Sequence, residues 1–81
     1  MKLQNAIRRA KKATGSEPII NHGFHRFEFN GEYVEFSRNG GTDEITCICT
    51  ASIGQESDSM TDYFPQVFHD NLTQALRSIG A

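Results

Sequence analysis

The clearest pattern of apolar and polar positions lies between Phe24 and Ser37, where two alternating runs flank Asn30-Gly31. Alternation with a period of two predicts β-strands that bury one face. Asn and Gly tolerate the two positive φ angles that a type I′ turn requires, so the segment predicts a two-residue β-hairpin. In that register Arg26 lies opposite Glu35.

The register divides the hairpin into two faces. One face is almost entirely apolar and predicts contact with a core, through His25, Phe27, Phe29, Val34 and Phe36. The other face mixes aromatic and charged residues. There the opposite charges of Arg26 and Glu35 suit a surface that meets solvent or a partner.

Residues 2–14 predict an amphipathic helix. Its apolar positions recur at i, i+3, i+4 and i+7, and most of these side chains are small, which favours close approach to a sheet. Gly15 supplies a C-terminal stop, and Lys11 and Lys12 complement the dipole of the last turns.

A second amphipathic helix is predicted towards the other end of the chain. Apolar residues between positions 67 and 79 repeat at helical spacing, and Gly80 follows as a stop. Its start stays open between Pro65 as a first-turn proline and Asp70 as an N-cap.

A third strand is predicted over residues 45–53, which are rich in β-branched residues. A short glycine-containing turn at 38–44 favours pairing beside the second strand of the hairpin. The alternation assigns two sets of side chains to opposite faces: Ile45, Cys47, Cys49, Ala51 and Ile53 on one, and Thr46, Ile48, Thr50 and Ser52 on the other. Residues 16–23 read as a connector in which one of two isoleucines tucks beneath the sheet.

These elements predict a single α+β domain over residues 1–81 in the order α-β-β-β-α. Its three-stranded antiparallel meander has two helices packed on one face. The other face is then left open and displays Phe24, Arg26, Tyr33, Glu35, Thr46, Ile48 and Thr50. This face is either a partner-binding surface or an ordinary solvated one.

Composition argues for a cytoplasmic location. The sequence contains no apolar run long enough to span a membrane, and the segment 1–12 lacks the apolar region of a secretory signal. Cys47 and Cys49 would lie roughly 6.5 to 7 Å apart along one strand, at the limit for a disulfide. Two free thiols are therefore expected.

The sequence carries no recognisable catalytic or cofactor motif. His22, His25 and His69, together with the two cysteines, lack the spacing of zinc sites, and the carboxylates of residues 56–62 lie in a polar loop. We therefore expect no enzyme activity, no metal and no cofactor.

Charge is unevenly distributed along the chain. Residues 1–16 hold five basic residues and no acidic one, whereas residues 17–81 hold three basic residues and all ten acidic ones. The cations Arg8, Arg9, Lys11 and Lys12 either neutralise the acidic remainder, within the fold or in a dimer, or meet phosphate or an acidic partner.

Residues 58–68 combine two acidic residues with five large apolar ones, more than a loop needs unless its aromatics cap the core. With the element order, Asp58, Asp62, Tyr63 and Phe64 resemble small domains of phage and mobile-element proteins, free-standing or appended to large polyvalent proteins. The resemblance implies an accessory or host-interaction role, inhibition of a host defence system included. It brings no catalytic residues.

The element order is also that of the double-stranded RNA-binding domain. That family begins its second helix with lysines that clamp phosphate, whereas here the corresponding segment holds Asp62 and Asp70. We therefore favour a module that binds a protein partner through Phe24, Arg26, Tyr33, Glu35, Ile48, Asp58, Asp62, Tyr63 and Phe64. Nucleic-acid binding through the basic first helix is the alternative.

Overall fold

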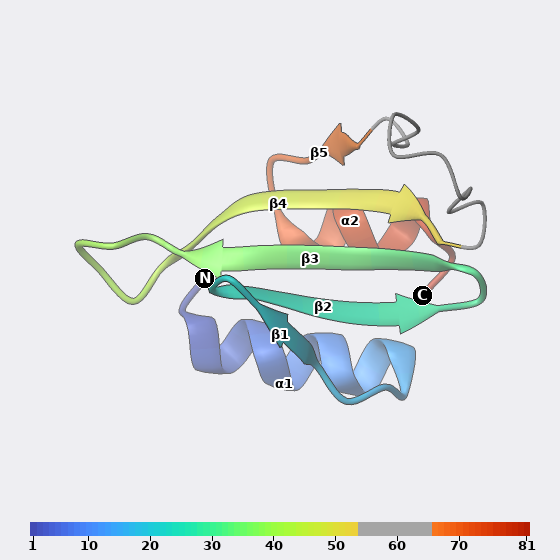
Figure 1. The fold of residues 1–81 in the computed structure, drawn as a ribbon, viewed down its shortest axis with the longest axis horizontal. Helices are drawn as coiled ribbons and strands as arrows, with labels where there is room; N and C mark the ends of the chain where they lie inside the picture. Colours follow the sequence, from blue (N-terminus) through green and yellow to red (C-terminus); the bar gives the residue numbers. More distant parts are fainter. Residues whose placement is uncertain (54–65) are drawn as a thin grey trace.

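The computed structural model describes residues 1–53 and 66–81 (Figure 1). This part of the chain forms two helices and five strands. In chain order they are α1 (Leu3–Thr14), β1 (Ile19–Asn21), β2 (Phe24–Phe29), β3 (Glu32–Arg38), β4 (Ile45–Ser52), β5 (Val67–Phe68) and α2 (Leu72–Ser78).

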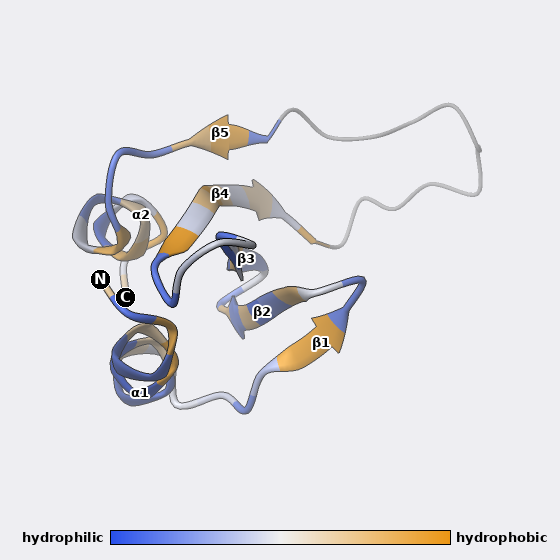
Figure 2. Ribbon diagram, turned by 90° about the vertical axis from the view of Figure 1, so that its left-hand side faces the viewer, coloured by the Kyte–Doolittle hydropathy of each residue, from blue (hydrophilic) through white to orange (hydrophobic). Residues whose placement is uncertain are grey.

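The five strands form one antiparallel sheet in the order β1-β2-β3-β4-β5. Both helices lie on the same side of it (Figure 2). The predicted α+β class and the meander are confirmed. The predicted number of three strands is wrong, because a short strand is added at each edge.

The central hairpin has the predicted register. Asn30 and Gly31 adopt φ angles of 55° and 83°, the positive values of a type I′ turn. Arg26 pairs with Glu35, and the six residue pairs from Phe29–Glu32 to Phe24–Ser37 have a continuous register without a bulge.

A second tight hairpin joins β1 to β2. His22 and Gly23 have φ angles of 51° and 82°, and Asn21 lies opposite Phe24. The prediction that residues 16–23 are only a connector is therefore wrong, because Ile19–Asn21 form β1. Neither isoleucine of this segment is tucked beneath the sheet, because both belong to an exposed edge strand.

A β-bulge interrupts β4. Cys47 has a φ of 54°, and the register against β3 shifts between Glu35 and Ser37. The extra residue reverses the alternation, so Ile48 points to the helices beside Ile45, which itself packs against the core. Thr50 lies opposite Val34, on that same face.

The predicted faces of β4 are thus wrong after the bulge. Ile48 and Thr50 belong to the helix side, whereas Cys49 and Ala51 lie opposite the far-side residues Glu35 and Tyr33.

The core fills the space between the sheet and the helices. Helix α1 packs on β2, and α2 packs on β4. Ala6 and Ala10 are fully buried, so the small side chains of α1 let it lie close to the sheet, as predicted. The buried members of the core are Ala6, Ala10, Phe27, Val34, Phe36, Ile48, Leu72, Ala75, Leu76 and Ile79.

The first helix has the predicted extent and ends at Gly15, whose φ is 71°. Its start is tied to the sheet by backbone hydrogen bonds, from the amide of Leu3 to the carbonyl of Asp43 and from the amide of Ile45 to the carbonyl of Met1. These bonds fix α1 beside the turn that leads into β4.

The second helix begins later than either predicted start. Asn71 is its N-cap, because the side-chain oxygen of Asn71 accepts a hydrogen bond of 2.9 Å from the amide of Gln74. Asp70 precedes the cap, and residues 67–68, assigned to the helix from the sequence, form β5 instead. Pro65 lies outside the described residues.

We expect Gly31→Ala to lower the free energy of unfolding by about 1 to 2 kcal/mol, because alanine at positive φ is strained. No atom lies within 4 Å of the added methyl group, so the cost comes from the backbone alone. Gly41→Ala is the matched control, since Gly41 has equal space and no positive φ. Urea denaturation measures both, and equal stabilities would contradict the turn assignment.

Candidate partner-binding face

The far face is the side of the sheet that points away from α1 and α2. One row of directly opposed residues crosses all five strands on this face: Ile19, Arg26, Glu35, Cys49 and Phe68. Directly paired residues share a face, and at the usual strand spacing the row spans roughly 19 Å. The row therefore brings together residues that are up to 49 positions apart in the chain.

The two ends of the row are apolar and exposed. Ile19 on β1 is 50% exposed, and Phe68 on β5 is 65% exposed. Sequence reasoning missed both, because it assigned them to a connector and to the second helix. The only local signal was that each lies beside a second large apolar residue. In an extended strand adjacent side chains point to opposite faces of the sheet, so one of the two must point away from the core.

The middle of the row is a polar cluster around Glu35, which is only 9% exposed. The Nε of Arg26 lies 3.5 Å from its Oε2. Its Oε1 accepts hydrogen bonds from Nε2 of Gln66 at 3.3 Å and from Sγ of Cys49 at 3.7 Å. A carboxylate this deeply buried needs such partners, so the cluster holds Glu35 in one place.

Arg26 is held from a second direction. Its guanidinium carbon lies 4.0 Å from the centre of the Tyr33 ring, a cation–π contact that also covers the ring. The expectation that Tyr33 and Glu35 are displayed on an open surface is therefore wrong, since both are buried. Their contacts orient the half-buried Arg26.

A hollow of about 300 Å³ adjoins this cluster. It is lined by Ile19, Asn21, His22, Phe24, Arg26 and Glu35. Apolar side chains thus stand beside an oriented cation, an arrangement that can accept a side chain of a partner.

The structure brings together Phe24, Arg26, Tyr33 and Glu35 from the predicted partner-binding set. Ile48 is not part of this site: the bulge at Cys47 turns it into the core. The other predicted residues, Asp58, Asp62, Tyr63 and Phe64, lie outside the described residues.

The two cysteines are free thiols in different surroundings. Cys47 is exposed at the bulge, whereas Cys49 is 1% exposed. Burial, followed by the nearby charge of Glu35 and its hydrogen bond, raises the pKa of Cys49 to about 12. Cys49 is thus a poor nucleophile at neutral pH.

A small hydroxyl and histidine cluster lies on the helix side. Nε2 of His69 lies 2.9 Å from Oγ1 of Thr50 and 3.4 Å from Oγ of Ser78. Ser78 donates its hydroxyl hydrogen to the carbonyl of Ala75 at 2.8 Å, so this hydrogen is not directed at His69. We interpret the cluster as a link between β4 and α2, which sequence reasoning missed because the residues are far apart in the chain.

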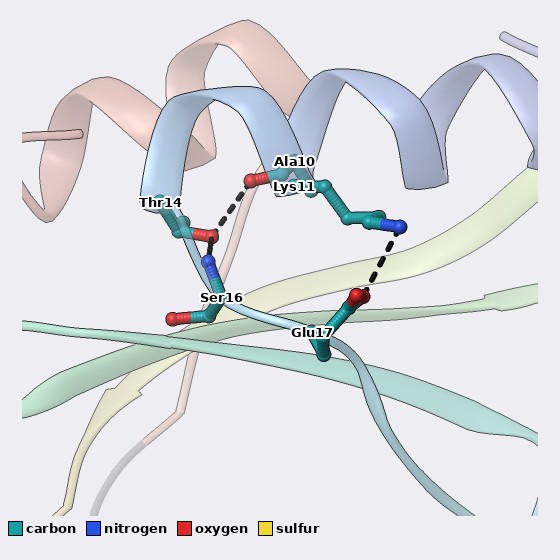
Figure 3. Close-up of polar contacts among 5 residues, drawn as sticks. All are labelled: Ala10, Lys11, Thr14, Ser16 and Glu17. Atoms are coloured by element: carbon teal, nitrogen blue, oxygen red, sulfur yellow. Dashed lines mark hydrogen bonds and ion pairs between the residues drawn. The ribbon is translucent and has the colours of Figure 1, made fainter.

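The predicted nucleic-acid residues Arg8, Arg9, Lys11 and Lys12 are all exposed on α1. They lie in the helical layer, on the opposite side of the sheet from the far face. The end of this helix is built by local bonds: Oγ1 of Thr14 donates to the carbonyl of Ala10, and Lys11 pairs with Glu17 at 3.1 Å (Figure 3).

Within residues 1–53 and 66–81, no group of three or more His, Cys, Asp and Glu side chains is placed to hold a metal ion. Neither helix in this part has the length and apolar content needed to cross a membrane.

Comparison of the chain with protein families, with curated proteins and with solved structures finds no match.

We expect Arg26→Gln to destabilise the protein by about 1 to 3 kcal/mol, because it leaves the buried carboxylate of Glu35 without its cation. Adding Glu35→Gln should recover part of this loss. Arg38→Gln is the control and should cost less than about 1 kcal/mol, since Arg38 and Asp43 form an exposed pair. Equal costs for Arg26 and Arg38 in chemical denaturation would contradict this account.

We expect the two thiols to react at very different rates at pH 8. With a pKa of about 12, only about one Cys49 in ten thousand is a thiolate at that pH, and burial blocks access as well. An aromatic disulfide reagent should modify Cys47 quickly and Cys49 only after denaturation. Cys47→Ser should abolish the fast reaction, and a fast thiol that persists in this variant would refute the assignment.

Proposed function

We propose that this chain is a small non-enzymatic interaction module that binds a protein partner through the far face of its sheet. One observation carries the proposal: Ile19 and Phe68, both exposed, end the same row of residues at opposite edges of the sheet. Two exposed apolar side chains, one of them aromatic, thus share one face with Arg26, and aromatic residues and arginine are enriched in protein interfaces.

The oriented arginine supports the same proposal. Arginine and aromatic residues dominate the binding energy of many interfaces. Arg26 is already fixed by Glu35 and Tyr33, so it loses less side-chain entropy when a partner binds. The hollow beside it supplies a place for an acidic or aromatic side chain of the partner.

The biological setting forms a further part of the proposal. The resemblance to small phage and mobile-element domains rests on Asp58, Asp62, Tyr63 and Phe64 and on the element order, which α1, β2, β3, β4 and α2 share with the predicted order. It supports an accessory protein that acts in the host cytoplasm. Binding to a component of a host defence system, and thereby inhibiting it, is the form of accessory role that we propose. No catalytic step is needed for such inhibition.

The test is affinity capture from host lysate with immobilised protein, followed by mass spectrometry. The variant Ile19→Ser/Phe68→Ser should lose the captured protein, because both apolar ends of the row are removed. Ile20→Ser/Val67→Ser is the matched control. These two residues lie on the same edge strands and are similarly exposed, at 64% and 55%, but their side chains point to the helix side of the sheet.

Thermal melting of each variant must accompany the capture, so that loss of fold is distinguished from loss of binding. Equal retention of a partner by both double variants would overturn the far-face proposal. A partner lost only by the control would move the binding surface to the helix side.

A further inference from the structure

The exposed side of α1 carries a strip of basic and amide side chains. Gln4, Asn5, Arg8, Arg9, Lys11 and Lys12 are all exposed, and no acidic residue occurs within the helix. Arg8 and Lys12 are neighbours at i and i+4, on the side opposite the buried Ala6 and Ala10. At 1.5 Å per residue, the strip from Gln4 to Lys12 spans about 12 Å of the helix axis, and its four cations, Arg8 to Lys12, span about 6 Å.

Two hollows that share Gln4 follow this strip. One, of about 460 Å³, is lined by Gln4, Ile7, Arg8, Lys11 and Lys12. The other, of about 310 Å³, is lined by Lys2, Leu3, Gln4, Asn5, Arg38 and Asp43. Arg8, Lys11 and Lys12 thus border one shallow, open depression, and Lys2 and Arg38 border the other.

Most of these cations are not neutralised by the described part of the chain. Lys11 pairs with Glu17, but Arg8, Arg9 and Lys12 take part in no ion pair among residues 1–53 and 66–81. Arg8 donates a hydrogen bond only to the side-chain oxygen of Asn5, at 3.3 Å. Within residues 1–53 and 66–81, ion pairing therefore neutralises Lys11 alone.

The acidic residues near α1 do not oppose an anionic ligand strongly, because each is paired. Glu17 pairs with Lys11, Asp43 with Arg38, and Glu44 with the N-terminal amine. Glu28 and Glu35 point to the far face, on the other side of the sheet. The sheet thus separates Glu28 and Glu35 from the basic helix.

We propose that the basic strip of α1 binds the phosphate backbone of double-stranded nucleic acid without reading its sequence. A duplex carries one charge per roughly 1.7 Å of its axis, so four cations that span about 6 Å of the helix, on long side chains, lie within reach of several phosphates. Arginine, lysine and amide side chains are the groups that contact phosphate and sugar in such complexes. This inference is independent of the partner proposed for the far face.

Three other occupants fit the strip less well. A membrane surface requires an exposed apolar face on the helix, whereas the apolar stripe of α1 is turned to the sheet. Single-stranded nucleic acid binds through aromatic stacking platforms, and α1 contains no aromatic residue. The absence of aromatic anchors also disfavours a protein partner at this surface.

The test uses fluorescently labelled 20-base-pair RNA and DNA duplexes of arbitrary sequence and measures anisotropy at several salt concentrations. The folded wild-type protein should bind both with micromolar affinity at 50 mM salt and lose affinity steeply by 200 mM. Arg8→Gln/Lys12→Gln should weaken binding about tenfold or more and reduce the salt slope by about two, one for each phosphate that the variant no longer neutralises. Replacing all four cations by Gln should abolish binding.

Arg77→Gln is the control for Arg8→Gln/Lys12→Gln, because it also removes an exposed cation from a helix, but from α2 rather than α1. The control should retain wild-type affinity, and so should Ile19→Ser/Phe68→Ser, which tests the far face separately. Absence of duplex binding at 50 mM salt, or equal loss in the Arg77 control, would overturn the proposal. Tighter binding of a single strand, or competition by polyglutamate as effective as that by unlabelled duplex, would overturn it as well.

Discussion

The left-handed backbone of Cys47 is the constraint on which both faces of the sheet depend. Before this residue β4 directs Ile45 to the helices, and strict alternation would then send Ile48 to the far face. The bulge adds one residue and turns Ile48 into the core, while Cys49 comes to lie opposite Glu35. A positive φ costs a non-glycine residue roughly 1 to 2 kcal/mol, which burial of one isoleucine side chain is large enough to offset.

Local chemistry made the central part of the fold predictable, and the same reasoning shows why the bulge was not. Asn30-Gly31 determines both the turn and the register, so the positions of Arg26 and Glu35 followed from two residues and an alternation. The run from Ile45 to Ile53 is apolar or β-branched at nearly every position, so either register satisfies its pattern. Only packing against the helices decides between them, and packing is not local information.

The edge strands and the site show the same limit. Two-residue apolar runs such as Val67-Phe68 fit a helical and an extended period equally well, so the exposed ends of the row could not be recognised from spacing. Asn71 rather than Asp70 caps α2, since its side-chain oxygen accepts from the amide of Gln74, while Oε1 of Gln74 accepts from the amide of Asp70. The spacing of Asn71 and Gln74, which resembles that of a capping box, was present in the sequence. The hairpin register placed Arg26 and its neighbours on one face correctly. Their burial depended on contacts with Cys49 and Gln66, from distant parts of the chain.

The sheet separates two kinds of surface that use different physics. On the far face, the charges of Arg26 and Glu35 neutralise each other in an ion pair. The exposed side chains of Ile19 and Phe68 therefore supply the apolar surface that a partner can bury. On α1 the apolar residues pack in or against the core, and the cations are exposed at the surface. A partner of the first surface would gain mainly from apolar contact and depend little on salt, whereas a ligand of the second would depend on salt strongly. An 81-residue chain can therefore offer two separate binding surfaces. The far face offers exposed apolar side chains, and the outer side of α1 offers exposed cations.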